Sequence, residues 1–465
     1  MATTEPSTTP ARPRKAIWPG GVPKPLMPYS PVITAGGWVF TAGQIATDFE
    51  TGLAPEVIVE PGAPFYGDSL ELQSRFVLKN LAETLAAAGV DIGTDLMRIY
   101  QWFTSPYPTD EERAEGITWP RMSITPYLDV RNEFIQSKRP ASTGMVCREL
   151  MVKDTIVEVD MIAFEPIPGV EKIAFDTPEG VPAPLAGYSP AVRWGDWIFT
   201  AGEIPVDWRG DHLSDRHMGV PSALAPEARI NPYLWYGDDV ERQTEYTLEK
   251  LAKICEAAGG HIENTVKAEV YIGHPNDFLG MEKAWKRWFP NNPPARVTIP
   301  HMGLGGAGSR VEIALMLLAD DASISMETIE TSGAPEPVVH EPQAMKAGNF
   351  VFYSTQMPAD ASGGLAKETM RHPNFPWYKE PALLQMEYML GNIDAIASAA
   401  GSSVENICRR QAFHDDLTWF QMMISRWGAA FPKDPPASTT MKIGGPMQVP
   451  GAHLLLDLIG YVPEA

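Results

Sequence analysis

The chain has 465 residues, 44% of them hydrophobic and 20% charged, which is the composition of a globular protein with about three domains. Its net charge of −21 disfavours binding to nucleic acid or to anionic membranes, because both are themselves negative. The chain has only three cysteines, no apolar run near the roughly 18 residues of a membrane span, and no apolar segment after its basic N-terminal residues. We therefore expect a cytoplasmic protein with neither nucleic-acid nor membrane partners.

A threefold internal repeat organises the chain. Residues 1–14, rich in Thr and Pro, are expected to form a disordered tail. After it, the segments PYSPVITAGGWVFTAGQIATD, GYSPAVRWGDWIFTAGEIPVD and HEPQAMKAGNFVFYSTQMPAD align with one another. Each is followed by an Ala-Gly turn, ending at Gly89, Gly259 and Gly401, and by a Pro-Ala pair, beginning at Pro140, Pro294 and Pro436. Three ordered anchors predict three domains, residues 15–168, 169–322 and 323–465.

The elements of one repeat are clearest in its second copy. WIFTAGEI indicates a strand, and DDVERQTEYTLEKLAKICEAAGG has the apolar spacing of a helix that ends at Gly259. TVKAEVYIG predicts a strand and DFLGMEKAWKRWF a second helix, and ARVTIP and RVEIALMLL are expected to close the unit as a hairpin. The order ββαβαββ is a two-layer α+β domain with both helices on one face of its sheet. Three such sheets can cover their open faces by packing around a shared axis, as an intramolecular pseudo-trimer.

Several of these motifs carry a family resemblance. GYSPAV, FTAGEIP, QTEYTLEKL, the AAG turn, NPPAR and the VEI strand resemble the RidA (YjgF-type) reactive-intermediate deaminase family, most completely in repeat two. Members of that family are usually homotrimers with clefts between adjacent subunits. The resemblance therefore implies one chain folded as a trimer, with three non-equivalent clefts between its repeats. It also implies hydrolysis of imines or enamines without a metal or an organic cofactor.

Three positions hold the polar groups of the resemblance: the start of the unit, the residue after the Pro-Ala pair, and the closing strand. In repeat two these positions hold Tyr188, Arg296 and Glu312. Their counterparts are Tyr29, Ser142 and Glu158 in repeat one, and Glu341, Ser438 and Leu455 in repeat three. Because only repeat two keeps all three groups, we expect a single competent cleft.

Arg296 and Glu312 lie symmetrically about Leu304 in the sequence. In a hairpin closed there, the two side chains would face each other across antiparallel strands. The guanidinium could then hold a substrate carboxylate while the carboxyl group handles water and protons. The pattern alone equally fits a cross-strand ion pair. The resemblance implies that Arg296 binds a substrate carboxylate. In the resulting hypothesis, Glu312 shuttles protons or holds the water, and Tyr188 hydrogen-bonds the ligand.

Some residues depart from the family pattern. Ala201 stands where a Ser or Thr is common, and Thr298 stands where a Cys is common. Both remain candidates for substrate binding, since the family holds its water through backbone groups of this strand. Trp235 and Tyr236 precede the first helix of repeat two, and such aromatic rings can stack on a planar ligand or pack against a neighbouring repeat.

Two other motifs point to different chemistry. Residues 303–308 match GxGxxG, but a dinucleotide site needs a following helix, and a strand is expected there. His274 with Asp277, and His414 with Asp415 and Asp416, fit helix capping better than metal ligation.

The main hypothesis is a cofactor-independent hydrolytic deaminase. Its substrate would be a small-molecule imine or enamine that bears a carboxylate, for example a larger unsaturated amino acid from the catabolism of an aromatic or N-heterocyclic compound. The alternatives are a chorismatase-like or ring-opening hydrolase on the same fold, and a non-catalytic small-molecule binding protein. Association of the pseudo-trimeric monomer into larger oligomers is left open.

Overall fold

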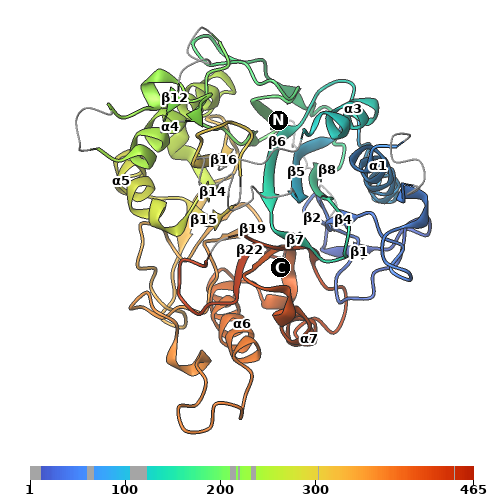
Figure 1. The fold of residues 1–465 in the computed structure, drawn as a ribbon, viewed down its shortest axis with the longest axis vertical. Helices are drawn as coiled ribbons and strands as arrows, with labels where there is room; N and C mark the ends of the chain where they lie inside the picture. The colour runs from blue at the N-terminus through green and yellow to red at the C-terminus, as the bar shows by residue number, and fades with distance from the viewer. Residues whose placement is uncertain are drawn as a thin grey trace, which may run out of the picture.

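A computed structural model describes residues 12–59, 67–104, 123–209, 216–217, 220–231, 237–301, 303–444 and 446–464. Figure 1 shows three lobes around a common centre, in blue to teal, green to yellow, and orange to red. In each lobe the helices lie on the outside and the sheet faces the centre. None of the described helices is long and apolar enough to cross a membrane.

The three repeats share one order of helices and main strands, to which repeats one and two each add short strands of their own. Repeat one contains β1 (Lys15–Ile17), β2 (Val32–Ala35), β3 (Trp38–Thr41), β4 (Gln44–Ile45), α1 (Ser69–Ala87), β5 (Leu96–Thr104), α3 (Thr125–Phe134), β6 (Ala141–Cys147), β7 (Glu149–Leu150) and β8 (Val157–Phe164). Repeat two contains β9 (Ile173–Ala174), β10 (Ala191–Trp194), β11 (Trp197–Thr200), β12 (Arg216–His217), β13 (Val220–Pro221), α4 (Asp239–Ala257), β14 (Thr265–Ile272), α5 (Phe278–Trp288), β15 (Ala295–Pro300) and β16 (Val311–Leu318). Repeat three contains β17 (Met326–Ile329), β18 (Ala344–Ala347), β19 (Phe350–Tyr353), α6 (Pro381–Ala399), β20 (Ile407–His414), α7 (Phe420–Ala429), β21 (Ala437–Lys442) and β22 (Leu454–Tyr461). The predicted ββαβαββ order is confirmed.

The sheet order corrects one expectation. In repeat two the strands run β15-β14-β16-β11-β10-β9, so β14 lies between the two strands that were expected to form a hairpin. Arg296 pairs with Ala268, and Glu312 pairs with Tyr271, on opposite sides of β14. The physical reason is the crossover through α5, which makes β15 a parallel neighbour of β14 and leaves the other edge of β14 to the closing strand. Arg296 and Glu312 therefore do not face each other.

Local sequence signals explain where the first helix of each repeat begins and ends. Asp68 and Asp238 cap α1 and α4, each accepting two backbone N–H hydrogen bonds, whereas Glu380 at the start of α6 accepts none through its side chain. Gly259 follows α4 with φ +81°, a conformation that favours glycine at a helix C-terminus. In the predicted tail, residues 1–11 lie outside the described residues, and Arg14 donates to the carbonyl of Ile407 at 3.0 Å.

Both faces of each sheet are buried, but against different partners. Three apolar clusters lie between a sheet and its own helices, one for each repeat. A fourth cluster draws residues from all three repeats at the centre, where the ring centroid of Trp38 lies 4.8 Å from that of Trp197 and 4.6 Å from that of Phe350. These three aromatic residues occupy the same position in the three repeats. The packing of three sheets around a shared axis is thus confirmed.

A ring of buried ion pairs links the repeats near this cluster. Each pair joins two different repeats: Arg98–Glu269 at 2.6 Å, Lys267–Asp457 at 2.6 Å and Arg409–Asp160 at 3.3 Å. All six side chains are buried, and the three cations balance the three carboxylates. The ring is therefore electrically neutral and belongs to all three repeats.

Candidate active site

One cleft lies at each boundary between repeats. In each, the early strand region of one repeat donates a backbone hydrogen bond to the residue after the Pro-Ala pair of another: Gly202 to Ser142 (3.0 Å), Thr355 to Arg296 (2.9 Å) and Gly43 to Ser438 (3.1 Å). We call these the 1/2, 2/3 and 3/1 clefts, after the repeats that form them. Their cavities differ widely, with volumes of about 460, 360 and 30 Å³. Only the first two have room for an organic ligand.

This arrangement divides the predicted site residues between two clefts. Tyr188 and Glu312 line the 1/2 cleft, whereas Thr298 lines the 2/3 cleft and Arg296 lies behind it. The expectation that Tyr188, Arg296 and Glu312 share one cleft is therefore wrong. It failed because each cleft takes its Tyr and Glu positions from one repeat and its Pro-Ala strand from the neighbouring repeat.

The carboxyl group of Glu312 occupies space that is free because residue 202 is a glycine. A Cβ atom built on Gly202 would lie 1.9 Å from Glu312 Oε1, so only glycine leaves room for the carboxyl group. Gly43 and Glu158 repeat this geometry in the 3/1 cleft, also at 1.9 Å. In repeat three, Thr355 replaces the glycine and Leu455 replaces the glutamate. The glycine is thus present in the two repeats that have the glutamate.

Burial favours the neutral form of Glu312. Only 4% of this residue is exposed, and burial, with the nearby charge of Glu203, raises its pKa well above the ordinary value. Glu203 itself has a cationic partner, because Lys250 Nζ lies 2.8 Å from its carboxylate. Burial, Glu203 and Glu312 also raise the pKa of Tyr188. In the 1/2 cleft the raised pKa of Glu312 therefore favours a carboxyl group that can donate a proton, whereas the Tyr188 phenol can donate a hydrogen bond.

Arg131 brings a guanidinium to this cleft. It stands on α3, nine residues before Pro140, where the other repeats have Trp285 and Trp427. Ser142, at the position of Arg296, lines the same cavity.

The guanidinium of Arg131 has only neutral acceptors among the residues that the structure describes. It donates to the carbonyls of Ala186 and Gly187, and Nη1 lies 3.5 Å from Gln101 Oε1. Burial lowers its pKa, as expected for a buried cation without a carboxylate partner. Arg131 is thus a positive charge that a ligand carboxylate can neutralise.

Arg131 could not be predicted from the three positions of the family resemblance, because none of them lies on the second helix of the repeat. The signal that could have found it is the conserved distance of nine residues to the Pro-Ala pair, which superposes Arg131 on two tryptophans.

Arg296, in contrast, is already neutralised. Its guanidinium contacts Glu282 at 2.8 Å and Glu341 at 3.2 Å, and it lies 4.9 Å from the ring centroid of Trp285. Arg296 is not among the residues that line the 2/3 cavity within the described part of the chain, whereas Glu341 is. This pairing leaves Arg296 poorly placed to bind a substrate carboxylate.

The remaining predicted residues have other surroundings. Ala201 is fully buried behind the wall of the 1/2 cleft, which its neighbours Gly202 and Glu203 line. Trp235 and Tyr236 lie outside the described residues. His274 and Asp416 accept backbone N–H hydrogen bonds at the starts of short helical turns, as capping predicts. The capping expectation is wrong for the other two residues: His414 ends strand β20, with both ring nitrogens buried and without a partner among the described residues, and Asp415 pairs with His453 at 2.8 Å.

The two other motifs do not form cofactor sites in the described structure. Strand β16 follows the glycine-rich turn, so the helix that a dinucleotide site needs is not there. The described residues contain no group of three or more His, Cys, Asp or Glu side chains that could hold a metal ion.

Comparisons with known proteins identify the repeat. The model of the family described as Endoribonuclease L-PSP matches residues 21–101, 179–318 and 331–445. The 3-aminoacrylate deaminase RutC of Acinetobacter baylyi is 26% identical over 137 residues, which are 30% of this chain and 90% of that protein. A 2-iminobutanoate/2-iminopropanoate deaminase of Rattus norvegicus is 31% identical over 132 residues, 28% of this chain and 80% of that protein.

A solved structure adds one further comparison. The crystal structure of RidA from an Antarctic Psychrobacter species matches 29% of this chain and 98% of its own, with 26% identity and a TM-score of 0.25. The three family matches fall one within each predicted repeat and together cover more than half of the chain. The chain therefore belongs to the Endoribonuclease L-PSP, or RidA, family, whose unit it contains in three tandem copies.

Proposed function

We propose that the protein is a hydrolytic deaminase and that it acts on a carboxylate-bearing imine or enamine in the 1/2 cleft. The observation that carries this proposal is that one cavity is lined both by Glu312, whose carboxyl pKa is raised, and by Arg131, whose guanidinium has no carboxylate partner among the described residues. Two relatives named as deaminases, of 3-aminoacrylate and of 2-iminobutanoate/2-iminopropanoate, support the reaction class.

The chemistry needs an anchored substrate and a proton donor. Arg131 binds the substrate carboxylate, and Tyr188 donates a hydrogen bond to the ligand. Glu312 donates its proton to the enamine carbon or the imine nitrogen, which leaves an electrophilic iminium carbon. Water adds to that carbon and returns a proton to the Glu312 carboxylate. Glu312 then gives this proton to the amine nitrogen, the C–N bond breaks to release ammonia, and the hydroxyl proton returns to Glu312 as the keto group forms.

The cavity suggests a substrate larger than the smallest 2-imino acids. It has a volume of about 460 Å³, and part of its wall is apolar, with contributions from Phe103, Leu128, Met145 and Leu304. A pocket of this kind suits an extended, unsaturated amino acid such as an intermediate of aromatic or N-heterocycle catabolism.

The 3/1 cleft provides a matched control for the test. Ammonia release would be measured from a series of carboxylate-bearing imines and enamines generated in situ, running from 2-aminoacrylate to conjugated aminomuconate-like acids. We expect Glu312→Gln to lower kcat by about 10²–10⁴-fold. Glu158→Gln removes the equivalent carboxyl group from a cavity of only about 30 Å³, so it should leave turnover unchanged.

Arg131→Ala tests the anchor separately. We expect it to raise KM by about tenfold or more for carboxylate substrates, with a smaller effect on the corresponding carboxamides. Equal turnover by wild type and Glu312→Gln would contradict the proposal. Products formed without ammonia would instead support a ring-opening or enol-ether hydrolase. Ligand binding without any product would support a binding protein.

A further inference from the structure

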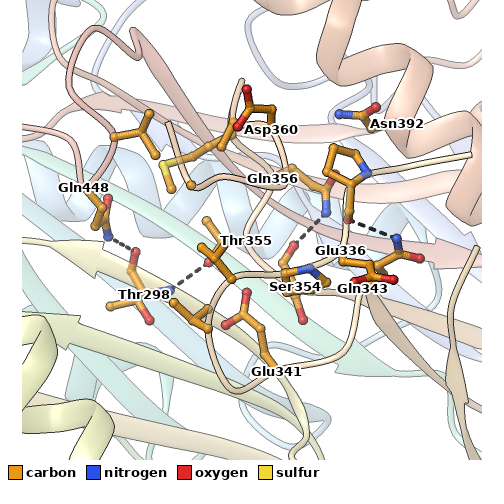
Figure 2. A pocket seen from close by; sticks show the side chains of 18 of the residues that line it. Thr298, Glu336, Glu341, Gln343, Ser354, Thr355, Gln356, Asp360, Asn392 and Gln448 are labelled. Atoms are coloured by element: carbon orange, nitrogen blue, oxygen red, sulfur yellow. Dashed lines mark hydrogen bonds between the residues drawn. The ribbon is translucent and has the colours of Figure 1, made fainter. Parts of the chain in front are cut away.

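The 2/3 cleft contains a second cavity of about 360 Å³ with one polar and one apolar wall. Figure 2 shows Thr298, Glu341, Ser354, Thr355 and Gln448 around the same space. The apolar wall includes Phe278, Leu279, Val338, Met357 and Val449. Such a cavity suits a small molecule with a polar end and an apolar body.

The charges around this cavity favour a cation. The guanidinium of Arg296 contacts Glu282 and Glu341, and Lys286 also lies 3.8 Å from Glu282. Of these four charged side chains, only Glu341 lines the cavity within the described part of the chain. Glu336 and Asp360 add further carboxylates to the wall, and no Lys, Arg or His lines the cavity within the described part of the chain. The charged side chains that line the cavity are thus all carboxylates within the described residues, and they repel an anion.

Unsatisfied hydrogen-bonding groups mark the same cavity independently. The Thr298 residue is 3% exposed, and its hydroxyl has no hydrogen-bond partner among the described residues. Gln448 donates to the Thr298 carbonyl at 2.5 Å, while its own side-chain oxygen is buried without a partner. Buried groups of this kind cost free energy unless a ligand or water satisfies them, and both of these oxygens can accept N–H hydrogen bonds.

We propose that the 2/3 cleft is a second ligand site, which binds a small organic ammonium ion, a primary amine carried on an apolar body. Glu341 pairs with the ammonium group, the oxygens of Thr298 and Gln448 accept its hydrogen bonds, and the apolar wall covers the remainder. Burial raises the pKa of Glu341 to about 7, so a bound ammonium would stabilise its ionised form. The two large clefts of one chain thus select ligands of opposite charge.

Three probes of similar shape test this assignment: 2-phenylethylammonium, 3-phenylpropanamide and 3-phenylpropanoate. Binding to the full chain would be measured by titration calorimetry at about pH 8, where Glu341 is mostly ionised. The titrations would use the Arg131→Ala variant, so that the anionic probe does not bind in the 1/2 cleft. We expect the cation to bind about tenfold more tightly, or better, than the neutral and anionic probes.

Glu341→Gln should abolish that preference, and Glu158→Gln, the matched control in the 3/1 cleft, should keep it. If Glu341→Gln does not fold, as judged by circular dichroism, Asp360→Asn tests the same wall and should weaken cation binding several-fold. Failure of the cation to bind, equal binding of all three probes, or a preference unchanged in these variants would overturn the proposal. Because this readout is binding in another cleft, it is independent of whether the 1/2 cleft deaminates.

Discussion

At the scale of single residues, Gly202 and Glu312 form one unit. The carboxyl oxygen lies where a Cβ atom of residue 202 would be, so the size of one residue sets the position of the other. Repeat three shows the alternative, since Thr355 occurs there together with Leu455. The position of the proton donor therefore depends on backbone space as well as on the glutamate itself.

Gly202→Ala should displace the Glu312 carboxyl group without removing it. Because misplacing a reacting group by about 1 Å can cost about 10²-fold in rate, we expect a loss of kcat of that order. Steady-state ammonia release measures the effect. Gly43→Ala creates the same clash with Glu158. It should lower stability about as much as Gly202→Ala does, but it should leave the rate of ammonia release unchanged. Normal kcat in Gly202→Ala would show that the carboxyl position is unimportant.

The raised pKa values of Glu158 and Glu312 also predict how stability depends on pH. Burial holds both pKa values well above the ordinary value, so the folded protein keeps these groups protonated while the unfolded chain ionises them. Their contribution to the free energy of unfolding is complete below the ordinary glutamate pKa. It is lost as the pH rises through the raised pKa.

Glu312→Gln and Glu158→Gln should each flatten this decline of stability with rising pH. Thermal unfolding at about pH 5 and about pH 8 measures it, and the wild type should lose more in Tm than either variant. Equal losses in all three proteins would show that these carboxyl groups titrate normally. The two variants are thus expected to change the pH dependence of stability in the same direction and to differ in activity.

At the scale of elements, the sequence predicted strands and helices well but not their neighbours. Helix α4 and strand β14 follow from local apolar spacing, and this information lies within each segment. The insertion of β14 between β15 and β16 depends on a crossover between distant segments, which no local pattern records. Arg131 was missed for a related reason, since a helix of one repeat carries the charge that a strand carries in another.

Helix capping gives a test at this scale. Asp68→Ala removes a side chain that accepts two backbone N–H hydrogen bonds at the start of α1, and should lower the free energy of unfolding by about 0.5–2 kcal/mol. Glu380→Ala changes the equivalent position of α6, where no such bond exists, and should have little effect. Urea titration followed by circular dichroism distinguishes them. Equal destabilisation would contradict the capping assignment.

At the scale of the whole molecule, the ring of ion pairs makes the three repeats interdependent. Arg409 of repeat three contacts Asp160 of repeat one, Glu269 of repeat two and Asp457 of its own repeat. Removing the Arg409 guanidinium therefore removes an ionic contact from each of the three repeats. We therefore expect the chain to unfold as one unit rather than repeat by repeat.

Arg409→Met should destabilise the entire chain at a cost of about 3–5 kcal/mol, because it leaves the buried carboxylate of Asp160 without its cationic partner, whereas Glu269 and Asp457 keep Arg98 and Lys267. Urea unfolding followed by tryptophan fluorescence should show one transition at a lower midpoint. Arg75→Met removes an exposed ion pair with Glu133 and should cost less than about 1 kcal/mol. Separate transitions in Arg409→Met, with two repeats as stable as before, would show that the ring does not couple them.

Joining the three units in one polypeptide also removes a constraint that symmetry imposes on a homotrimer. When identical subunits assemble, each substitution appears at every boundary, so the sites change together. Here Ser142, Arg296 and Ser438 occupy one position, yet each borders a different cleft. A single codon therefore alters one boundary and spares the other two. Such a chain can change or lose one site while it retains the others. The number of ligands bound per chain is therefore not fixed at three, as it would be for three identical sites.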